Sequence, residues 1–208
     1  MVANHWFFLI VEFNKGFFFL KNFLTLSVTT YLFGIILWVL WYFVDQNVPF
    51  LIGEGSWYYL PHAARVLCVV YFGYKAIPSL YLAELSGPYL LVPFMYSFDT
   101  YLSSLISVLS VPLSIQVLRI LSFTLGDTAS SPLNKRNYKH IYLITFISAG
   151  FNAILVNLYL SRNELNFPGL ITDIEQVSRF FVGDIIGTVL VFVSLSYILK
   201  PIIAQSRN

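Results

Sequence analysis

The chain has 208 residues, of which 58% are hydrophobic and 11% charged, and its formal net charge is +2. A mean hydropathy of +0.75 and so few charges exclude an ordinary soluble domain, in which about 25% of residues are charged. The long apolar stretches lack the alternation of barrel strands, so the sequence predicts an all-α integral membrane protein.

Residues 1–22 come before the first long apolar stretch and carry Glu12, Lys15 and Lys21 among aromatic side chains. Two interpretations stay open: an aromatic segment in the membrane interface, or a disordered tail, because the polar face is thin. The charges and the long apolar run that follows argue against a cleaved signal peptide. We therefore expect three parts, an interfacial segment over 1–22, a polytopic membrane domain over 23–201 and a short cytoplasmic tail over 202–208.

Five apolar stretches approach or exceed the roughly 20 residues that cross a hydrocarbon core. They cover 26–44, 57–85, 89–118, 141–160 and 180–199. The second stretch also carries Arg65, Lys75 and Glu84, so it is either one flawed spanning helix or two short ones. The lone Cys68 within it indicates neither a disulfide framework nor a metal site.

The distribution of Lys and Arg decides between these two interpretations. With a single helix, the base-rich loop that follows 89–118 would lie opposite Lys15 and Lys21, against the tendency of short cytoplasmic loops to collect bases. A break at 73–75 gives helices near 62–74, 76–93 and 100–118. Nine of the twelve Lys and Arg residues then fall on one side, namely Lys15, Lys21, Lys75, Arg119, Lys135, Arg136, Lys139, Lys200 and Arg207.

The sequence thus predicts about six transmembrane helices, the second short or broken near Lys75, with both termini cytoplasmic. Gly73 and Pro78 favour the break, since glycine relaxes the turn and proline disfavours helix at the residue before it. Lys75 itself needs no role beyond snorkelling to the boundary. A helix over 62–74 reaches only about 20 Å, so it must be short, tilted or partly re-entrant.

Three charged residues lie inside apolar runs, where each costs about 2.5 to 3.5 kcal/mol on insertion scales. Arg65 and Asp184 have similar expected depths, so we expect them to approach each other. Glu84 is expected to pair with the same arginine or to remain protonated. Asn152 is expected to join this interior polar cluster. A ligand or signalling role and a purely architectural ion pair both remain open.

Two glycines and a histidine are expected to lie around this polar cluster. Gly183 and Gly187 flank Asp184 at four-residue spacing, which permits close backbone approach between helices. His62 is expected at the outer rim of the cluster, as an interface residue and not a ligand. The sequence contains no phosphate-binding loop, no His-Glu-x-x-His and no nucleophile beside a base, so we expect no enzyme, cofactor, metal site or nucleic-acid partner.

The order of several motifs is similar to that of a known family. They are Pro61-His62-Ala63-Ala64, Gly73-Tyr74-Lys75-Ala76-Ile77-Pro78, a basic loop, Ser148-Ala149-Gly150 and Gly183-Asp184-Ile185-Ile186-Gly187. Together these resemble the membrane-associated sensor domains of the first MASE type, over about residues 57–201. Family members usually have about eight spans and feed a cytoplasmic catalytic domain, and Arg65 replaces their usual small residue. The resemblance implies a stand-alone sensory or docking module of a bacterial inner membrane.

Three functions follow from these features. The first is a non-enzymatic sensory or docking module that acts through a membrane or cytoplasmic protein partner, in contact with the lipid bilayer and open to a small-molecule ligand. The second is a transport subunit similar to the substrate-binding subunits of vitamin importers, because broken helices mark transport sites. The third is a structural accessory subunit of a larger membrane complex.

Overall fold

The structure is a computed structural model that describes residues 2–47, 56–91, 98–121, 138–163 and 174–205. Within these ranges, side chains are described except at 2–20, 138, 161–163, 199 and 201–205. All regular structure in these ranges is helical, as composition predicts. The helices are α1 (Val2–Gln46), α2 (Pro61–Phe72), the 3-10 helix η2 (Gly73–Ala76), α3 (Ile77–Leu91), α4 (Phe98–Ile120), α5 (Tyr138–Asn163) and α6 (Ile174–Gln205).

Five helical stretches are long and apolar enough to cross a membrane. They are Lys21–Gln46, Pro61–Leu91, Phe98–Ile120, Lys139–Leu160 and Ile174–Ile198. Each exceeds the roughly 17 residues that a spanning helix requires. The chain therefore has the helices of a multi-pass membrane protein.

The stretch Pro61–Leu91 is not one straight helix. α2 ends at Gly73, whose φ of 67° and ψ of −157° lie in a region that is essentially restricted to glycine. The predicted break therefore lies at Gly73, and η2 links it to α3. Pro78 was expected to disrupt helix at the residue before it, but Ile77 is helical, with φ −55° and ψ −49°. Pro78 lies in the first turn of α3, where its missing N–H needs no partner.

The break folds α3 back along α2. Arg65 in α2 and Glu84 in α3 are 19 residues apart, yet Arg65 Nε lies 2.7 Å from Glu84 Oε1. In one continuous helix these residues would be separated by about 28 Å. The two helices therefore form a hairpin with its tip at η2.

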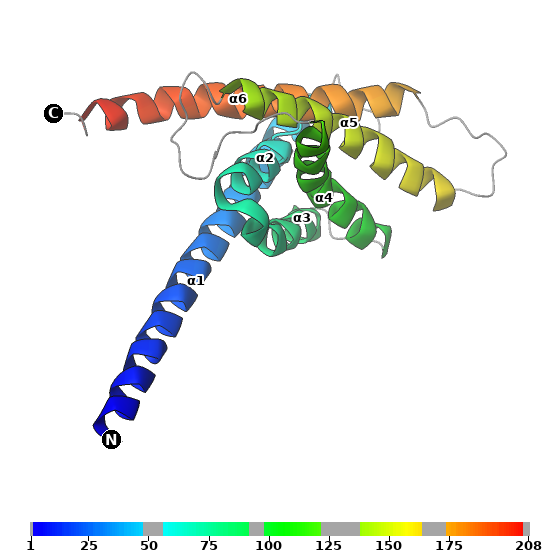
Figure 1. The fold of residues 1–208 in the computed structure, drawn as a ribbon. Helices are drawn as coiled ribbons and strands as arrows, with labels where there is room; N and C mark the ends of the chain where they lie inside the picture. The colour runs from blue at the N-terminus through cyan, green and yellow to red at the C-terminus, as the bar shows by residue number, and fades with distance from the viewer. Residues whose placement is uncertain (1, 48–55, 92–97, 122–137, 164–173, 206–208) are drawn as a thin grey trace.

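Helix α2 lies at the centre of the bundle, in contact with α1, α3, α4, α5 and α6. Every residue from Pro61 to Val70 is buried, including the polar His62 and Arg65. α1 packs mainly on α3, whereas α5 packs between α4 and α6. Figure 1 shows this bundle with two helices reaching beyond it, α1 at its N-terminal end and α6 at its C-terminal end.

The two ends of the bundle differ in charge. Gln116 of α4 donates to the Tyr74 hydroxyl of η2 at 2.6 Å, which places the last turns of α4 beside the tip of the hairpin. The first turn of α4 lies at the other end, where Tyr159 of α5 donates to Asp99 at 3.0 Å. Alternation of the helices places five described bases at the hairpin-tip end, here named the basic end: Lys21, Lys75, Arg119, Lys139 and Lys200.

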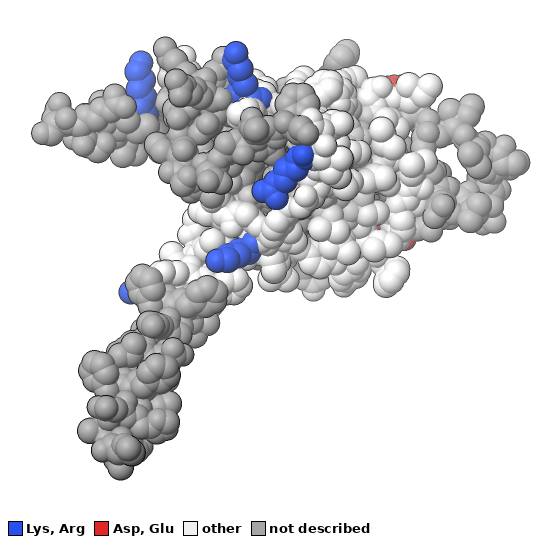
Figure 2. Space-filling model, viewed as in Figure 1, with Lys and Arg blue, Asp and Glu red and all other residues white. Residues whose placement is uncertain are grey.

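The opposite end, here named the acidic end, holds Asp45, Asp99 and Glu175 together with the base Arg179. In Figure 2 the Lys and Arg side chains lie toward the side from which the two long helices extend. The Asp and Glu side chains that are visible lie on the other side. This polarity matches the division of charges expected from the sequence.

The first and last helices run through the expected boundaries near the termini. α1 extends from Val2 to Gln46, so residues 2–22 lie in the same helix as the first apolar stretch. α6 continues to Gln205, so the first part of the expected tail 202–208 prolongs that helix. Most of the base-rich loop that follows 89–118 lies outside the described residues, which omit 122–137.

Candidate ligand cavity

A cavity of about 380 Å³ lies between the helices in the half of the bundle nearer the acidic end. Its volume is within the range of small-molecule sites in proteins. All six α-helices contribute to its wall, as does the segment that leads into α2. The lining residues are Trp38, Trp41, Asp45, Ser56, Tyr59, Arg65, Glu84, Pro88, Thr100, Ser103, Ser104, Ser107, Asn152, Val156, Leu160, Phe180 and Asp184.

Arg65 is held in this wall by a two-pronged ion pair with Glu84. Its Nε and Nη2 lie 2.7 Å and 3.0 Å from the two carboxylate oxygens, and Nη2 also donates to the Tyr59 hydroxyl at 3.1 Å. The Tyr59 hydroxyl in turn donates to Glu84 at 3.2 Å. Paired donors in one plane fix the guanidinium rigidly, because they match the geometry of a carboxylate.

Asp184 belongs to a second group of side chains on the opposite wall. Asn152 Nδ2 donates to its Oδ2 at 2.7 Å, and His62 Nδ1 lies 3.4 Å from the same oxygen. His62 Nε2 lies 3.1 Å from Ser148 Oγ. Asp184, Asn152 and His62 are all buried, so this group is shielded from lipid by the surrounding helices.

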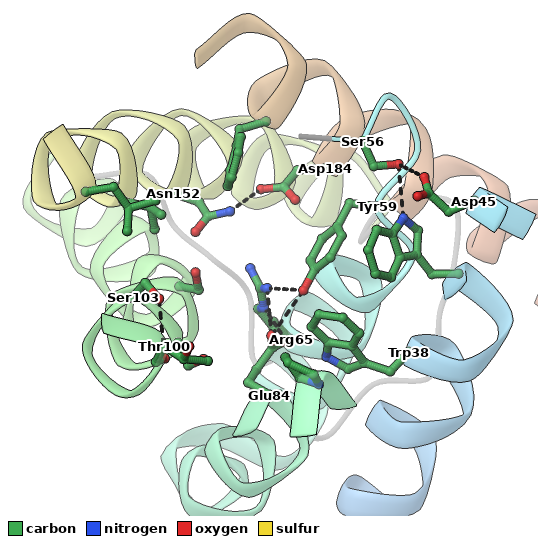
Figure 3. A pocket seen from close by; sticks show the side chains of 17 residues that line it. Trp38, Asp45, Ser56, Tyr59, Arg65, Glu84, Thr100, Ser103, Asn152 and Asp184 are labelled. Atoms are coloured by element: carbon green, nitrogen blue, oxygen red, sulfur yellow. Dashed lines mark hydrogen bonds and ion pairs between the residues drawn. The ribbon is translucent and has the colours of Figure 1, made fainter. Parts of the chain in front are cut away.

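Three buried polar atoms of the cavity residues have no hydrogen-bond partner within the described part of the chain. They are Nε1 of Trp38, Nη1 of Arg65 and Oδ1 of Asn152. Figure 3 shows the Arg65 and Asn152 side chains pointing toward one another across the cavity, from α2 and α5. A buried donor or acceptor that is left unsatisfied costs about 1–3 kcal/mol, and more when it is charged.

Aromatic rings form the wall beside α1. The rings of Trp38, Trp41 and Tyr59 meet edge to face, with centroids 5.1 to 5.5 Å apart. The guanidinium carbon of Arg65 lies 5.1 Å from the centroid of the Tyr59 ring. At the rim, Trp41 Nε1 donates to Ser56 Oγ at 3.0 Å, and Ser56 donates to Asp45 at 3.2 Å.

The glycines of α6 allow the segment that carries Tyr59 to enter the bundle. A Cβ at Gly183 would clash with the backbone oxygen of Ser56, and one at Gly187 would clash with that of Tyr59. The Tyr59 N–H donates to the Gly183 carbonyl at 2.9 Å. The close approach expected from this glycine pair therefore involves the segment before α2, and not a second helix.

The four residues of the expected interior cluster, Arg65, Glu84, Asn152 and Asp184, all line this cavity. The pairing of Glu84 with Arg65, one of the two expectations for Glu84, is confirmed, whereas Asp184 contacts Asn152 and His62 in place of the expected Arg65. The expectation that His62 lies at an outer rim is wrong, because its side chain is 0% exposed. Pro61 opens α2 inside the bundle, where the first turn of that helix is buried.

Sequence reasoning missed the aromatic wall and the hydroxyl groups of α4. Spacing could have indicated the hydroxyls, because residues three or four apart share a helix face. Four buried serines follow this spacing: Ser104, Ser107, Ser110 and Ser114. Tyr59 gave no such signal, since it precedes its helix and reaches the cavity through a tertiary contact.

Ser148, His62 and Asp184 follow the order of nucleophile, base and carboxylate in serine hydrolases. Ser148 is fully buried, however, and its hydroxyl also lies 3.1 Å from the Thr145 carbonyl. Neither Ser148 nor His62 lines the cavity. A molecule in the cavity would therefore meet Asp184 and Asn152, and not the serine hydroxyl.

No protein-family model, curated protein or solved structure is significantly similar to this chain.

Proposed function

We propose that this chain is a non-enzymatic membrane module that binds a small molecule in its interior cavity and acts through a protein partner, like the sensor domains that its motif order resembles. One observation carries the proposal: a buried charged cluster lines a cavity in which a guanidinium nitrogen and an amide oxygen have no partner in the described structure. Unpaired polar atoms would not stabilise a purely architectural cluster, because apolar packing stabilises a core equally well.

We further propose that all six helices cross the membrane, with both termini on the cytoplasmic side. The hairpin of α2 and α3 supports six crossings, since its tip carries Lys75 at the basic end. The location of Lys21, Arg119, Lys139 and Lys200 at that same end supports the orientation. The cavity then faces the outer half of the membrane, and the basic end faces the cytoplasm and the partner.

Purification from the native membrane in a mild detergent tests this function. We expect mass spectrometry to identify a stoichiometric partner with the wild-type protein, and we expect Asp184→Asn to fold and to recover the partner but to lose the cellular response. A matched Glu175→Gln variant, altered at an exposed acid of the same helix, should retain that response. If Asp184→Asn fails to insert, or no partner is recovered, the proposed sensory role is wrong.

A transport subunit is the second candidate, favoured by a helix break at Gly73 in a bundle that also encloses a polar cavity. Uptake of a solute that depends on the chain, and is lost in Asp184→Asn, would establish this function instead. Loss of assembly on changing lipid-facing aromatics, with Arg65 and Asp184 dispensable, would identify a structural accessory subunit.

A further inference from the structure

We propose that the cavity selects a small organic cation that also carries a neutral oxygen acceptor, such as an amine with a nearby hydroxyl or carbonyl group. This inference rests on the proposed function, since it assigns the chemistry of the ligand that the module binds. It follows from three independent features of the wall: charge, aromatic rings and unpaired polar atoms.

More acidic than basic residues line the cavity. Asp45, Glu84 and Asp184 line the cavity together with one base, Arg65. Arg65 is matched by Glu84 through two hydrogen bonds. Neither Asp45 nor Asp184 forms an ion pair with a Lys or Arg in the described residues. A cation in the cavity would supply the missing charge, whereas an anion would add to the repulsion.

The aromatic wall favours the same charge. Trp38, Trp41 and Tyr59 all line the cavity, and the faces of such rings attract cations through their quadrupoles. Arg65 already uses this attraction, since its guanidinium lies over the Tyr59 ring. Tryptophan is the strongest ring of this kind, so Trp38 and Trp41 suit an ammonium group.

The unpaired atoms define the polar groups of the ligand. Among the described residues, Asn152 Oδ1 is an acceptor without a donor, and Asn152 Nδ2 donates to Asp184. An ammonium group placed there would donate to the amide oxygen beside the carboxylate. Arg65 Nη1 and Trp38 Nε1 are donors without an acceptor in the same described structure, and an oxygen of the ligand would accept from Arg65 Nη1. Because Glu84 already balances the charge of Arg65, a neutral oxygen is sufficient.

Four matched probes separate these requirements on the wild-type protein in detergent. L-phenylalaninol carries an amine and a hydroxyl, phenethylamine lacks the hydroxyl, N-acetyl-L-phenylalaninol lacks the charge, and phenylacetate is an anion. The change in tryptophan fluorescence reports binding, since Trp38 and Trp41 line the cavity. We expect L-phenylalaninol to bind at least about tenfold more tightly than each of the others, as expected for one charge-assisted hydrogen bond.

Variants then assign the binding to the cavity. Asp184→Asn should weaken the binding of L-phenylalaninol at least about tenfold, because the substitution removes the charge that faces the ammonium group. Glu175→Gln removes an exposed acid from the same helix and should leave the affinity unchanged. Asp45→Asn is a second test at the rim of the cavity, should the Asp184 variant fail to fold.

The possible outcomes distinguish this inference from the proposed function. Tighter binding of phenylacetate or N-acetyl-L-phenylalaninol, with an affinity that Asp184→Asn changes, would overturn the cation and leave the cavity as a binding site. Equal binding of phenethylamine would overturn the oxygen requirement. If none of the four probes binds, the inference is wrong, and the proposed function is then decided by whether any endogenous molecule occupies the cavity.

Discussion

Arg65 is the residue whose surroundings most constrain this protein. It is 2% exposed and lies at the centre of the bundle, with Glu84 and Tyr59 around two of its nitrogens. Removing such a charge from water costs several kcal/mol, and the paired carboxylate recovers much of that cost. The ion pair therefore holds the α2–α3 hairpin closed and presents the third nitrogen to the cavity.

Replacing the partner of Arg65 should destabilise the protein strongly. We expect Glu84→Gln to lower the free energy of unfolding by about 3–5 kcal/mol, since it leaves a buried, uncompensated guanidinium. The pair of the exposed Glu175 and the half-buried Arg179 provides the control, and Glu175→Gln should cost less than about 1 kcal/mol, because water screens its carboxylate. Equal losses in a reversible unfolding titration in detergent would mean that water reaches Arg65.

For single residues, sequence reasoning predicted which charged side chains turn inward and gave the pairing of Glu84 with Arg65 as one alternative, but it did not predict the partners of Asp184. Arg65, Glu84 and Asp184 stand out because charges are costly in apolar helices. The depth of a residue in the membrane can be counted from the end of its helix. Similar depths therefore predict that Arg65 lies near Asp184. The direction of a side chain around the helix depends on packing, and packing gives Arg65 to Glu84 and Asp184 to Asn152.

At the scale of elements, two kinds of glycine shape the core. Gly73 is needed for its backbone conformation, because its φ is +67°. It is not needed for space, because a Cβ there would meet no atom within 4 Å. Gly183 and Gly187 are needed for space, because the backbone of 56–59 passes against them. The local break at Gly73 could be predicted from sequence, since it depends on nearby residues. The segment packed on α6 could not, since it depends on a contact distant in sequence.

Alanine substitutions separate these two roles. Gly187→Ala should lower stability by about 1–3 kcal/mol and shift the segment that carries Tyr59, because the added methyl overlaps its backbone. Gly150→Ala is the matched control in a neighbouring helix, where the nearest atom would lie at 3.8 Å, so it should be tolerated. Equal thermal stability of the two variants would contradict the close approach.

At the helix break, a substitution of Gly73 should lower stability through backbone strain alone. We expect Gly73→Ala to cost about 1–3 kcal/mol, because alanine is strained in this conformation although space is open around it. Thermal unfolding of the purified variant measures this loss. No change in stability would mean that the hairpin tip adopts another conformation.

For the whole molecule, charge and hydropathy predict the helical class and the charge at each end of the bundle, but not how the helices pack. The basic and acidic ends agree with the sequence, since Lys and Arg mark loops by their position along the chain alone. The central burial of α2 was not predicted, although its short length indicated shielding by protein. Its sequence is no more apolar than the others, and only the packing of five neighbours encloses it.

Labelling of single cysteines tests the proposed topology in a Cys68→Ala background. Six crossings predict that Lys75→Cys and Lys139→Cys react with a membrane-impermeant maleimide only from the cytoplasmic side, and Glu175→Cys only from the outside. All three positions are exposed in the structure. A Lys75→Cys protein that reacts from neither side would instead place this residue within the membrane, as a single span over 61–91 requires.

The most direct test of the central claim is native mass spectrometry of the purified protein, to detect a small molecule retained in the cavity. Our account predicts such a molecule in the wild-type protein and its loss in Ser107→Leu, which fills the cavity from α4. It should remain in Leu109→Ala, which alters the exposed face of the same helix. A wild-type protein without any retained molecule, or equal retention in Ser107→Leu, would contradict the account.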